Sequence, residues 1–202
     1  MARVLLLYAH PGHRHSHVNR AMFRAAQAIE GITAVDLYAR YPRFDIRIDA
    51  EQAQLLEHDI LLFQYPVFWY SSPALVKEWL DLVLEHGFAY GHDGTQLAGK
   101  RMMLAVSAAG PEEAYSSSGY QNFPLRTFLA PMEQTATLCK MDFTPPYVLY
   151  HALKAPKDGA LDAHVAGYVQ LLEALRDDRY DFDAASARDC VTRDTLPLHA
   201  EA

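Results

Sequence analysis

The stretch "RVLLLYAHPGHRHSHVN", from Arg3 to Asn19, decides the fold class. Its apolar run is continuous rather than alternating, which is typical of a strand buried on both faces of a parallel sheet. A polar loop follows, and beyond it apolar residues recur at helical spacing between Val18 and Ile29. We therefore predict a strand over residues 3–9, a loop, and a helix that ends near Gly31.

Further strands are expected along the chain. The apolar runs "DILLFQYP" (59–66) and "KRMMLAVSAA" (100–109) predict two more buried strands, each followed by a loop. The shorter runs "ITAVDLY" (32–38) and "TATLCKM" (135–141) are candidates for a fourth and a fifth strand.

Two more amphipathic helices follow from the spacing of apolar residues. One has Leu75, Trp79, Leu82 and Val83 at helical spacing, with Ser72 as a candidate cap and Pro73 at its first position. The other covers residues 161–175. Strands that alternate with helices predict an α/β fold, a parallel sheet with right-handed crossovers.

The length of 202 residues suits one domain, which we assign to residues 1–176. Residues 177–202 form a polar C-terminal tail, which we expect to be disordered or to lie on a partner.

The composition disfavours several classes of protein. A net charge of -7 argues against nucleic-acid binding and against a basic membrane-binding surface. The only cysteines are Cys139 and Cys190, too few for a disulfide framework or a zinc site. No apolar run is long enough to cross a bilayer, so we expect a cytoplasmic protein.

Three loops should lie together at the carboxyl ends of the strands, where open parallel sheets bind ligands. They are residues 10–19, 66–72 and 107–115. The chemistry of these loops carries the functional prediction.

The first loop predicts a phosphate site. Ser16 and Asn19 lie near a helix N-terminus, where unpaired N–H groups and the helix dipole favour an anion. Neither a GxGxxG nor a Walker motif is present, so a mononucleotide fits best. The alternative is a metal site made of His13, His15 and His17. No carboxylate or cysteine accompanies these histidines in the loop, so we predict no metal.

The other two loops predict a site for a flat ring. Any one of the bulky residues 67–70 can belong to the core, but four in a row cannot all face inward. Small residues around Gly110 would let the backbone approach the other edge of the same ring. A phosphate and a planar ring together indicate flavin mononucleotide, FMN.

Several motifs resemble a known family. They are "YAHP…SHVN", "QYPVFWYSSPALVKEWLDLVLEHGFAYG", "LAGK" and "TPPY". Together they resemble the flavodoxin-like NAD(P)H:quinone oxidoreductases, especially the Kef-type ancillary subunits of glutathione-regulated potassium-efflux antiporters. The resemblance extends to about Leu175 and implies a doubly wound, five-stranded parallel sheet with helices on both faces.

The resemblance also implies which residues contact the flavin. The phosphate contacts correspond to His10, Ser16, His17, Val18 and Asn19. The contacts with the ring correspond to Pro66, Val67, Phe68, Trp69 and Tyr70. The contacts on the other side of the ring correspond to Ser107, Ala108, Ala109 and Gly110. Tyr115 is the candidate catalytic residue, as a flavin or substrate contact.

Two positions depart from the family pattern. Ala109 stands where the family has the first glycine of its third loop, and a positive φ there would cost about 1 kcal/mol. Gln121 stands where the animal quinone reductases have a histidine, six residues after the tyrosine that corresponds to Tyr115. For that reason Tyr115 is assigned as a contact and not as a proven acid.

The expected function is two-electron, ping-pong transfer from NAD(P)H through FMN to a quinone, with FAD as the less favoured flavin. The resemblance implies a homodimer with active sites at the subunit interface. We expect replacement of Asn19 by Ala to weaken flavin binding far more than replacement of His13.

Other functions stay open at this point. The main alternative is an ancillary subunit that binds a membrane antiporter at the inner face of the membrane. A one-electron carrier and an azo or nitro reductase are further alternatives, and the choice between NADH and NADPH is undetermined.

Overall fold

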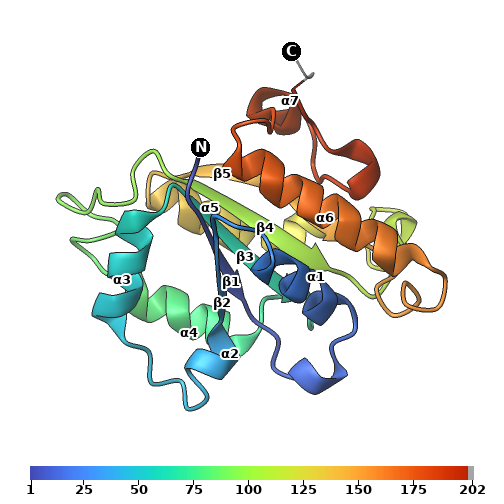
Figure 1. The fold of residues 1–202 in the computed structure, drawn as a ribbon, viewed down its shortest axis with the longest axis horizontal. Helices are drawn as coiled ribbons and strands as arrows, with labels where there is room; N and C mark the ends of the chain where they lie inside the picture. Colours follow the sequence, from blue (N-terminus) through green and yellow to red (C-terminus); the bar gives the residue numbers. More distant parts are fainter. Residues whose placement is uncertain (200–202) are drawn as a thin grey trace.

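The structure, a computed structural model, describes residues 1–199 apart from the side chain of His13. Within these residues, five strands form one parallel sheet in the order β2-β1-β3-β4-β5 (Figure 1). The strands are β1 (Val4–Tyr8), β2 (Ile32–Asp36), β3 (Ile60–Pro66), β4 (Arg101–Ser107) and β5 (Asp142–Leu149).

Helices cover both faces of the sheet (Figure 1). One face carries α1 (Val18–Gln27) and α6 (Ala160–Arg176), and the other carries α3 (Ile48–Glu57), α4 (Ala74–Val83) and α5 (Leu125–Leu138). The short helices are α2 (Leu37–Arg40), α7 (Phe182–Ser186), η1 (His13–His15), η2 (Glu112–Ala114) and η3 (Arg193–Thr195). The predicted flavodoxin-like, doubly wound, five-stranded sheet is therefore confirmed.

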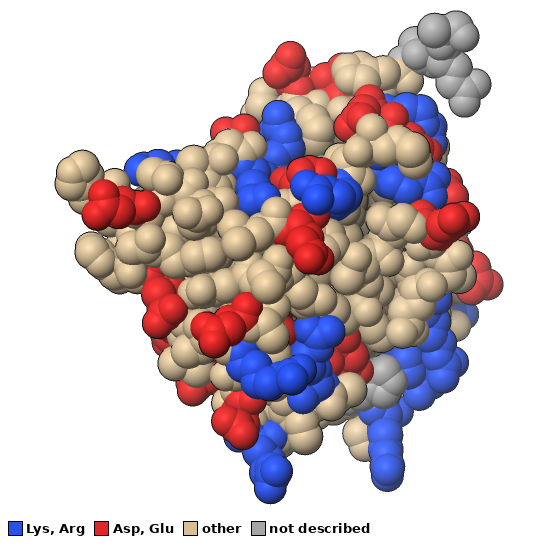
Figure 2. All heavy atoms as spheres, turned by 60° about the vertical axis from the view of Figure 1, so that its left-hand side comes forward, with Lys and Arg blue, Asp and Glu red and all other residues tan. Residues whose placement is uncertain are grey.

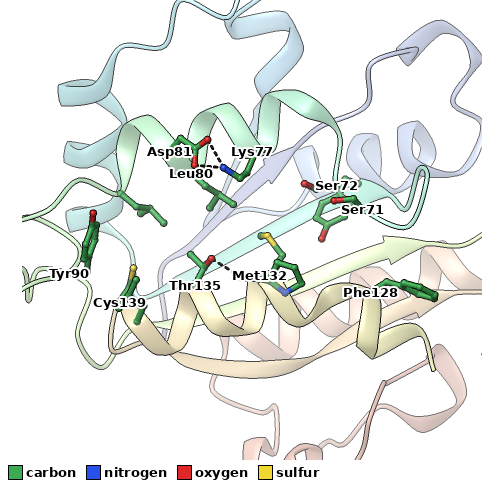
Figure 3. A pocket seen from close by; sticks show the side chains of 14 residues that line it. Ser71, Ser72, Lys77, Leu80, Asp81, Tyr90, Phe128, Met132, Thr135 and Cys139 are labelled. Atoms are coloured by element: carbon green, nitrogen blue, oxygen red, sulfur yellow. Dashed lines mark hydrogen bonds and ion pairs between the residues drawn. The ribbon is translucent and has the colours of Figure 1, made fainter. Parts of the chain in front are cut away.

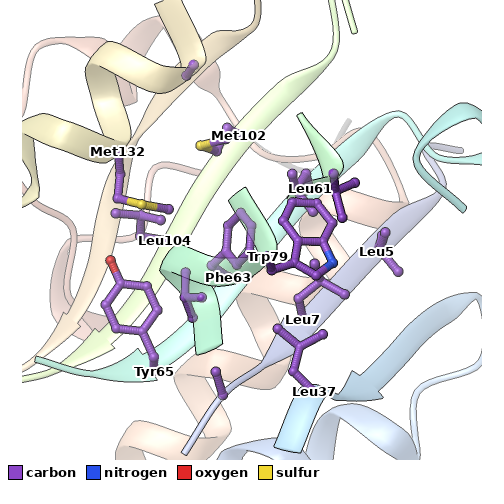
Figure 4. Close-up of a cluster of buried hydrophobic side chains, with 14 of the residues drawn as sticks. Leu5, Leu7, Leu37, Leu61, Phe63, Tyr65, Trp79, Met102, Leu104 and Met132 are labelled. Atoms are coloured by element: carbon purple, nitrogen blue, oxygen red, sulfur yellow. The ribbon is translucent and has the colours of Figure 1, made fainter. Parts of the chain in front are cut away.

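The strands are buried on both faces because their side chains alternate between two apolar clusters. Leu5 and Leu7 pack toward α3, α4 and α5, whereas Leu6 packs toward α1 and α6. Figure 4 shows the first cluster, in which the rings of Phe63 and Trp79 meet edge to face with 5.4 Å between centroids. Full burial of each such side chain contributes about 1.5–3 kcal/mol of hydrophobic stabilisation.

The fifth strand is not where the sequence analysis places it. Residues 135–138 of the run "TATLCKM" form the end of α5, and the strand is β5, which begins at Asp142. Pro145 and Pro146 obscure this strand in the sequence, because proline lacks the N–H that a central strand needs. Here they are tolerated because β5 is the edge strand.

The predicted start of α4 is also wrong by one residue. Ser72 makes no capping hydrogen bond, and Pro73 occupies the N-cap position ahead of the first helical residue, Ala74. The extended backbone of Pro73 explains the shift, since its ψ of 149° lies outside the helical region.

The expectation for the C-terminal tail is wrong for residues 177–199, which pack against their own domain. Tyr180, Ala185 and Val191 are buried there among a majority of polar residues. The N–H of Val191 donates to the carbonyl of Pro146, and the Val191 carbonyl accepts from Val148, both at 2.8 Å. The segment therefore covers part of the open edge of β5. Residues 200–202 lie outside the described part of the chain.

Candidate functional site

The candidate site lies where the chain direction switches between β1 and β3. These neighbouring strands are followed by helices on opposite faces of the sheet, which opens a crevice at their carboxyl ends. A cleft of about 340 Å³ opens there. It is lined by His10, Gly12, His15, Ser16, His17, Val18, Asn19, Pro66, Val67, Phe68, Ser107, Ala109, Ala152, Leu153 and Pro156.

The cleft brings together most of the predicted site residues, from all three predicted loops. Those that line it are His10, Ser16, His17, Val18, Asn19, Pro66, Val67, Phe68, Ser107 and Ala109. Those that do not line it are Trp69, Tyr70, Ala108, Gly110 and Tyr115.

A fourth wall of the cleft was not predicted. Ala152, Leu153 and Pro156 come from the connection between β5 and α6. Leu153 is 77% exposed, which is unusual for a leucine and agrees with a role at the rim of a binding site. Sequence reasoning missed this loop because β5 itself was misplaced.

The first loop presents the N-terminus of α1 to the cleft. The Ser16 hydroxyl accepts from the N–H of Arg20 at 3.1 Å, and His17 occupies the N-cap position without a side-chain cap. The first N–H groups of the helix, in residues 17–19, have no intrahelical acceptor. Together with the positive end of the helix dipole, they make a site for an anion.

The surface charge agrees with an anion site at this end of the molecule. Figure 2 shows several Lys and Arg side chains at its lower end, with acidic side chains among them, at the height where Figure 1 places α2 and the loop between β1 and α1. Arg14, in the loop between β1 and α1, and Arg43, a few residues after α2, are exposed.

His10 lies at the end of β1 and is 8% exposed. Its Nδ1 accepts from the N–H of Gly12 at 3.1 Å, and its ring meets the ring of Phe68 edge to face, with 5.5 Å between centroids. The imidazole therefore braces the first loop against the aromatic loop.

Asn19 and Ser107 form the buried floor of the cleft. The side-chain Nδ2 of Asn19 donates to the Ser107 hydroxyl at 2.7 Å, which ties the first loop to the third. Asn19 Oδ1 is buried and has no hydrogen-bond partner. Leaving a buried acceptor unpaired costs about 1–3 kcal/mol, so a water molecule or a ligand donor that reaches this atom would stabilise the site.

The aromatic loop divides its side chains between two environments. Phe68 and Ser71 exchange two backbone hydrogen bonds of 3.1 Å, which close a tight turn with Trp69 and Tyr70 at its tip. Both tip residues have positive φ, 49° and 64°, a strained conformation for bulky side chains. The turn directs Phe68 into the cleft and leaves Trp69 93% exposed.

The backbone donors expected to contact a ring are partly engaged elsewhere. The N–H of Val67 donates to the Ser107 carbonyl, and that of Ala108 to the Leu149 carbonyl. These two N–H groups are hydrogen-bonded to neighbouring strands, and the N–H of Phe68 is hydrogen-bonded within the turn. A ligand in the cleft must find its donors at other positions.

The third loop needs no glycine at residue 109. Ala109 is not among the residues with positive φ, so alanine carries no conformational penalty there. Gly110 is closely packed: an added Cβ would lie 2.8 Å from Oη of the exposed Tyr120, whose side chain can move, and 3.3 Å from Tyr115 Cε2.

Tyr115, the last residue of the third loop, packs in an aromatic cluster with Phe128 and Tyr150. Burial raises the pKa of the Tyr115 hydroxyl, so this group stays protonated at neutral pH. The structure places it outside the lining of the cleft.

A second cavity, of about 480 Å³, lies between α4 and α5 (Figure 3). Its walls include the Lys77–Asp81 ion pair from α4 and Met132 and Thr135 from α5. None of the predicted site residues lines this groove, which lies away from the carboxyl end of β1. We therefore locate the site in the smaller cleft.

The described part of the chain contains no group of three His, Cys, Asp or Glu side chains that could hold a metal ion. Within residues 1–199, no helix combines the length and the apolar character that a bilayer crossing needs.

Comparison with known proteins identifies the family. Residues 2–172 match a family described by its flavodoxin-like fold. The chain belongs to this family. The match ends inside α6, so the packed C-terminal segment of this flavodoxin-like protein lies outside it.

Three similar proteins illustrate the range of the family. The glutathione-regulated potassium-efflux system ancillary protein KefG of Serratia proteamaculans is 45% identical over 166 residues, 82% of this chain and 90% of that protein. The general stress protein 14 of Treponema denticola, solved in complex with FMN, is 34% identical with a TM-score of 0.80, covering 86% of this chain and 99% of that one. The NADPH-quinone reductase of P. pentosaceus is 27% identical with a TM-score of 0.73, covering 84% and 96%. The predicted resemblance to Kef-type ancillary proteins and quinone reductases is confirmed.

Proposed function

We propose that this protein is an FMN-dependent NAD(P)H:quinone oxidoreductase. The observation that carries the proposal is the cleft itself, which combines a helix N-terminus at one wall with apolar and aromatic side chains at another. Its volume lies within the range of small-molecule sites. The FMN complex of a structure with 34% sequence identity supports the choice of cofactor.

The residues of the cleft fit a flavin phosphate. The anion would accept from the backbone N–H groups of residues 17–19, next to exposed basic side chains of the same loop. Asn19 lines the cleft, and a small movement of its side chain would present the buried, unpaired Oδ1 to a donor of the bound molecule. The Ser107 hydroxyl accepts from Asn19, so its own hydrogen is left to donate toward the cleft.

The protein would supply binding, orientation and exclusion of water. When bound, FMN supplies the ability to accept a hydride from NAD(P)H and to pass two electrons to a quinone. Phe68, Val67 and the rim residue Leu153 would cover the apolar surface of the ring. Tyr115, packed against Phe128 and Tyr150 outside the lining of the cleft, would support the third loop.

The visible spectrum of the purified protein tests this proposal. FMN-loaded protein should bleach when NADPH or NADH is added without oxygen, and a quinone should restore the yellow colour. Protein that FMN cannot reconstitute, or that keeps its colour with both nucleotides, contradicts the proposal.

We also propose that two copies associate over the aromatic turn and the groove between α4 and α5. Trp69 is 93% exposed, and the ring of Tyr70 lies 4.9 Å from that of Phe128, which lines the groove. Large exposed aromatics beside an apolar groove are typical of an interface. Light scattering should give a dimer, and replacement of Trp69 by Ser should give a monomer.

A second candidate function rests on the 45% identity to KefG, which is named as an ancillary protein of a potassium-efflux system. The protein would then bind a membrane antiporter and associate with the membrane through it. Capture of the cognate antiporter from detergent extract tests this function. An Asn19→Ala variant that loses flavin but retains capture would separate the two functions.

A further inference from the structure

Gln64 is a polar residue in the middle of the core. It lies on the central strand β3 between Phe63 and Tyr65, and all three are fully buried. An amide in such a position is costly unless all of its hydrogen bonds are satisfied. Hydrophobic packing alone therefore does not explain a glutamine at this position.

Both ends of the Gln64 amide have partners on the helices that cover this face. Its Nε2 donates to the backbone carbonyl of Asn19 at 2.7 Å, and its Oε1 accepts from Tyr168 Oη at 3.2 Å. Asn19 belongs to the first turn of α1, and Tyr168 belongs to α6. The two helices lie side by side on one face of the sheet (Figure 1).

These bonds continue to the floor of the cleft. Asn19 donates through its side chain to Ser107, so one chain of hydrogen bonds joins Tyr168, Gln64, Asn19 and Ser107. We name this chain of four residues the Gln64 network. It joins elements from both sides of the cleft, and its last two members line it.

We propose that Gln64, held by Tyr168, is a positioning residue that orients the first turn of α1 toward a flavin phosphate. A carbonyl that is fixed within one turn of the helix start also fixes the neighbouring N–H groups of residues 17–19, because they belong to the same turn. This inference rests on the proposed function and goes beyond it by naming the residue that orients the N–H groups that would bind the phosphate.

The proposal distinguishes positioning from simple stability. A residue that only stabilises the fold should affect FMN and riboflavin equally, since the two ligands differ only in the phosphate. A residue that aims the phosphate donors should affect FMN alone. The ratio of the two dissociation constants therefore isolates the phosphate contribution.

The experiment measures quenching of flavin fluorescence by the flavin-free protein with FMN and with riboflavin. For the wild type, FMN should bind at least about 100-fold more tightly than riboflavin, since several charge-assisted hydrogen bonds are at stake. Gln64→Met, which keeps the volume without the amide, should reduce this ratio about 10-fold while the riboflavin constant stays within about twofold. Tyr168→Phe should reduce it about threefold.

A matched control lies on another strand. Thr144 on β5 is 3% exposed and its hydroxyl has no hydrogen-bond partner, so Thr144→Val changes a buried polar group outside the network. It should leave the ratio unchanged. If Gln64→Met fails to fold, Tyr168→Phe tests the same point, because it removes the hydrogen bond that holds the Gln64 amide and leaves the core volume almost unchanged.

Each other outcome overturns the inference. Equal weakening of both flavins in the Gln64 variants would show a structural role only. A wild-type ratio near one would show that α1 does not hold the phosphate. Wild-type protein that binds neither flavin would overturn the proposed function, and the inference with it.

Discussion

Two buried polar clusters of this protein differ in how completely their hydrogen-bonding atoms are paired. In the first, the carboxylate of Glu51 is fully buried and accepts from Tyr41 Oη at 2.5 Å, Arg40 at 2.8 Å and Trp79 Nε1 at 2.8 Å. We name these four residues the Glu51 cluster. Its carboxylate is fully partnered, whereas the Gln64 network ends at the cleft with Asn19 Oδ1 unpaired.

The difference shows how to separate structural from functional polar groups. A closed cluster such as that of Glu51 ties α2, α3 and α4 together and requires nothing from outside. The Gln64 network instead leaves one buried acceptor, Asn19 Oδ1, unpaired on a residue that lines the cleft, where a water molecule or a ligand donor can pair with it. Variants in the two clusters should therefore alter different properties, namely stability for the first and flavin binding for the second.

The largest effect should come from the Glu51 cluster. Glu51→Ala leaves the Trp79 N–H, the Tyr41 hydroxyl and the Arg40 guanidinium without their buried acceptor, so the free energy of unfolding should fall by about 4 kcal/mol. Urea denaturation measures this change. FMN affinity of the folded fraction should stay within about twofold of wild type, and a selective loss of FMN binding would break the comparison.

His164 is a third buried polar group, and it has an unpaired atom that lies away from the cleft. His164 is 1% exposed, and its Nε2 has no hydrogen-bond partner. Burial lowers the pKa of its imidazole to about 4 from an unfolded value near 6.5. The unfolded chain therefore binds this proton more readily, and the contribution to stability is complete above pH 6.5 and declines as the pH falls toward 4. The loss should reach about 3 kcal/mol.

Urea denaturation of the wild type and of His164→Gln between pH 4 and pH 8 measures this contribution. The glutamine variant should show a shallower decline below pH 6.5, because it has no imidazole to protonate. Parallel curves for the two proteins would assign the pH dependence to other groups.

Within the Gln64 network, Asn19→Ala should weaken FMN binding about 30-fold, because it removes both the tie to Ser107 and the open acceptor. The same change at His13 should alter FMN binding less than about threefold. Equilibrium titration with FMN gives both values. Equal losses for the two variants would contradict the phosphate site that we place at α1.

The smallest effect should come from the aromatic turn. Replacing Trp69 by Asn and Tyr70 by Gly, the residues that tolerate positive φ, should raise the free energy of unfolding by about 1–2 kcal/mol. The same double variant should lose dimerisation, because it removes the exposed aromatics. Trp69→Asn alone keeps the contact between Tyr70 and Phe128, and a loss of stability in this single variant would show that the turn is not strained.

The sequence predicted what depends on local pattern. Continuous apolar runs located β1, β3 and β4 to within two residues at each end, and the loops after these strands contain most of the cleft. Apolar residues at helical spacing likewise located α1 and α6.

The sequence did not reveal what depends on tertiary context. Prolines concealed β5 because their cost depends on whether the strand lies at an edge, which no local pattern shows. Because β5 was misplaced, the loop that follows it and contributes Leu153 to the cleft was not predicted either. The polar composition of the C-terminal segment gave no sign that it packs against the domain. The hydrogen-bond partners of Gln64 are 45 and 104 residues away in sequence, so no local pattern reveals them.

A crystal structure of the protein with FMN is the measurement that would test the proposed site most directly. We expect the phosphate oxygens within hydrogen-bonding distance of the N–H groups of residues 17–19, and the ring against Phe68. A phosphate bound elsewhere, for example in the groove between α4 and α5, would contradict this site.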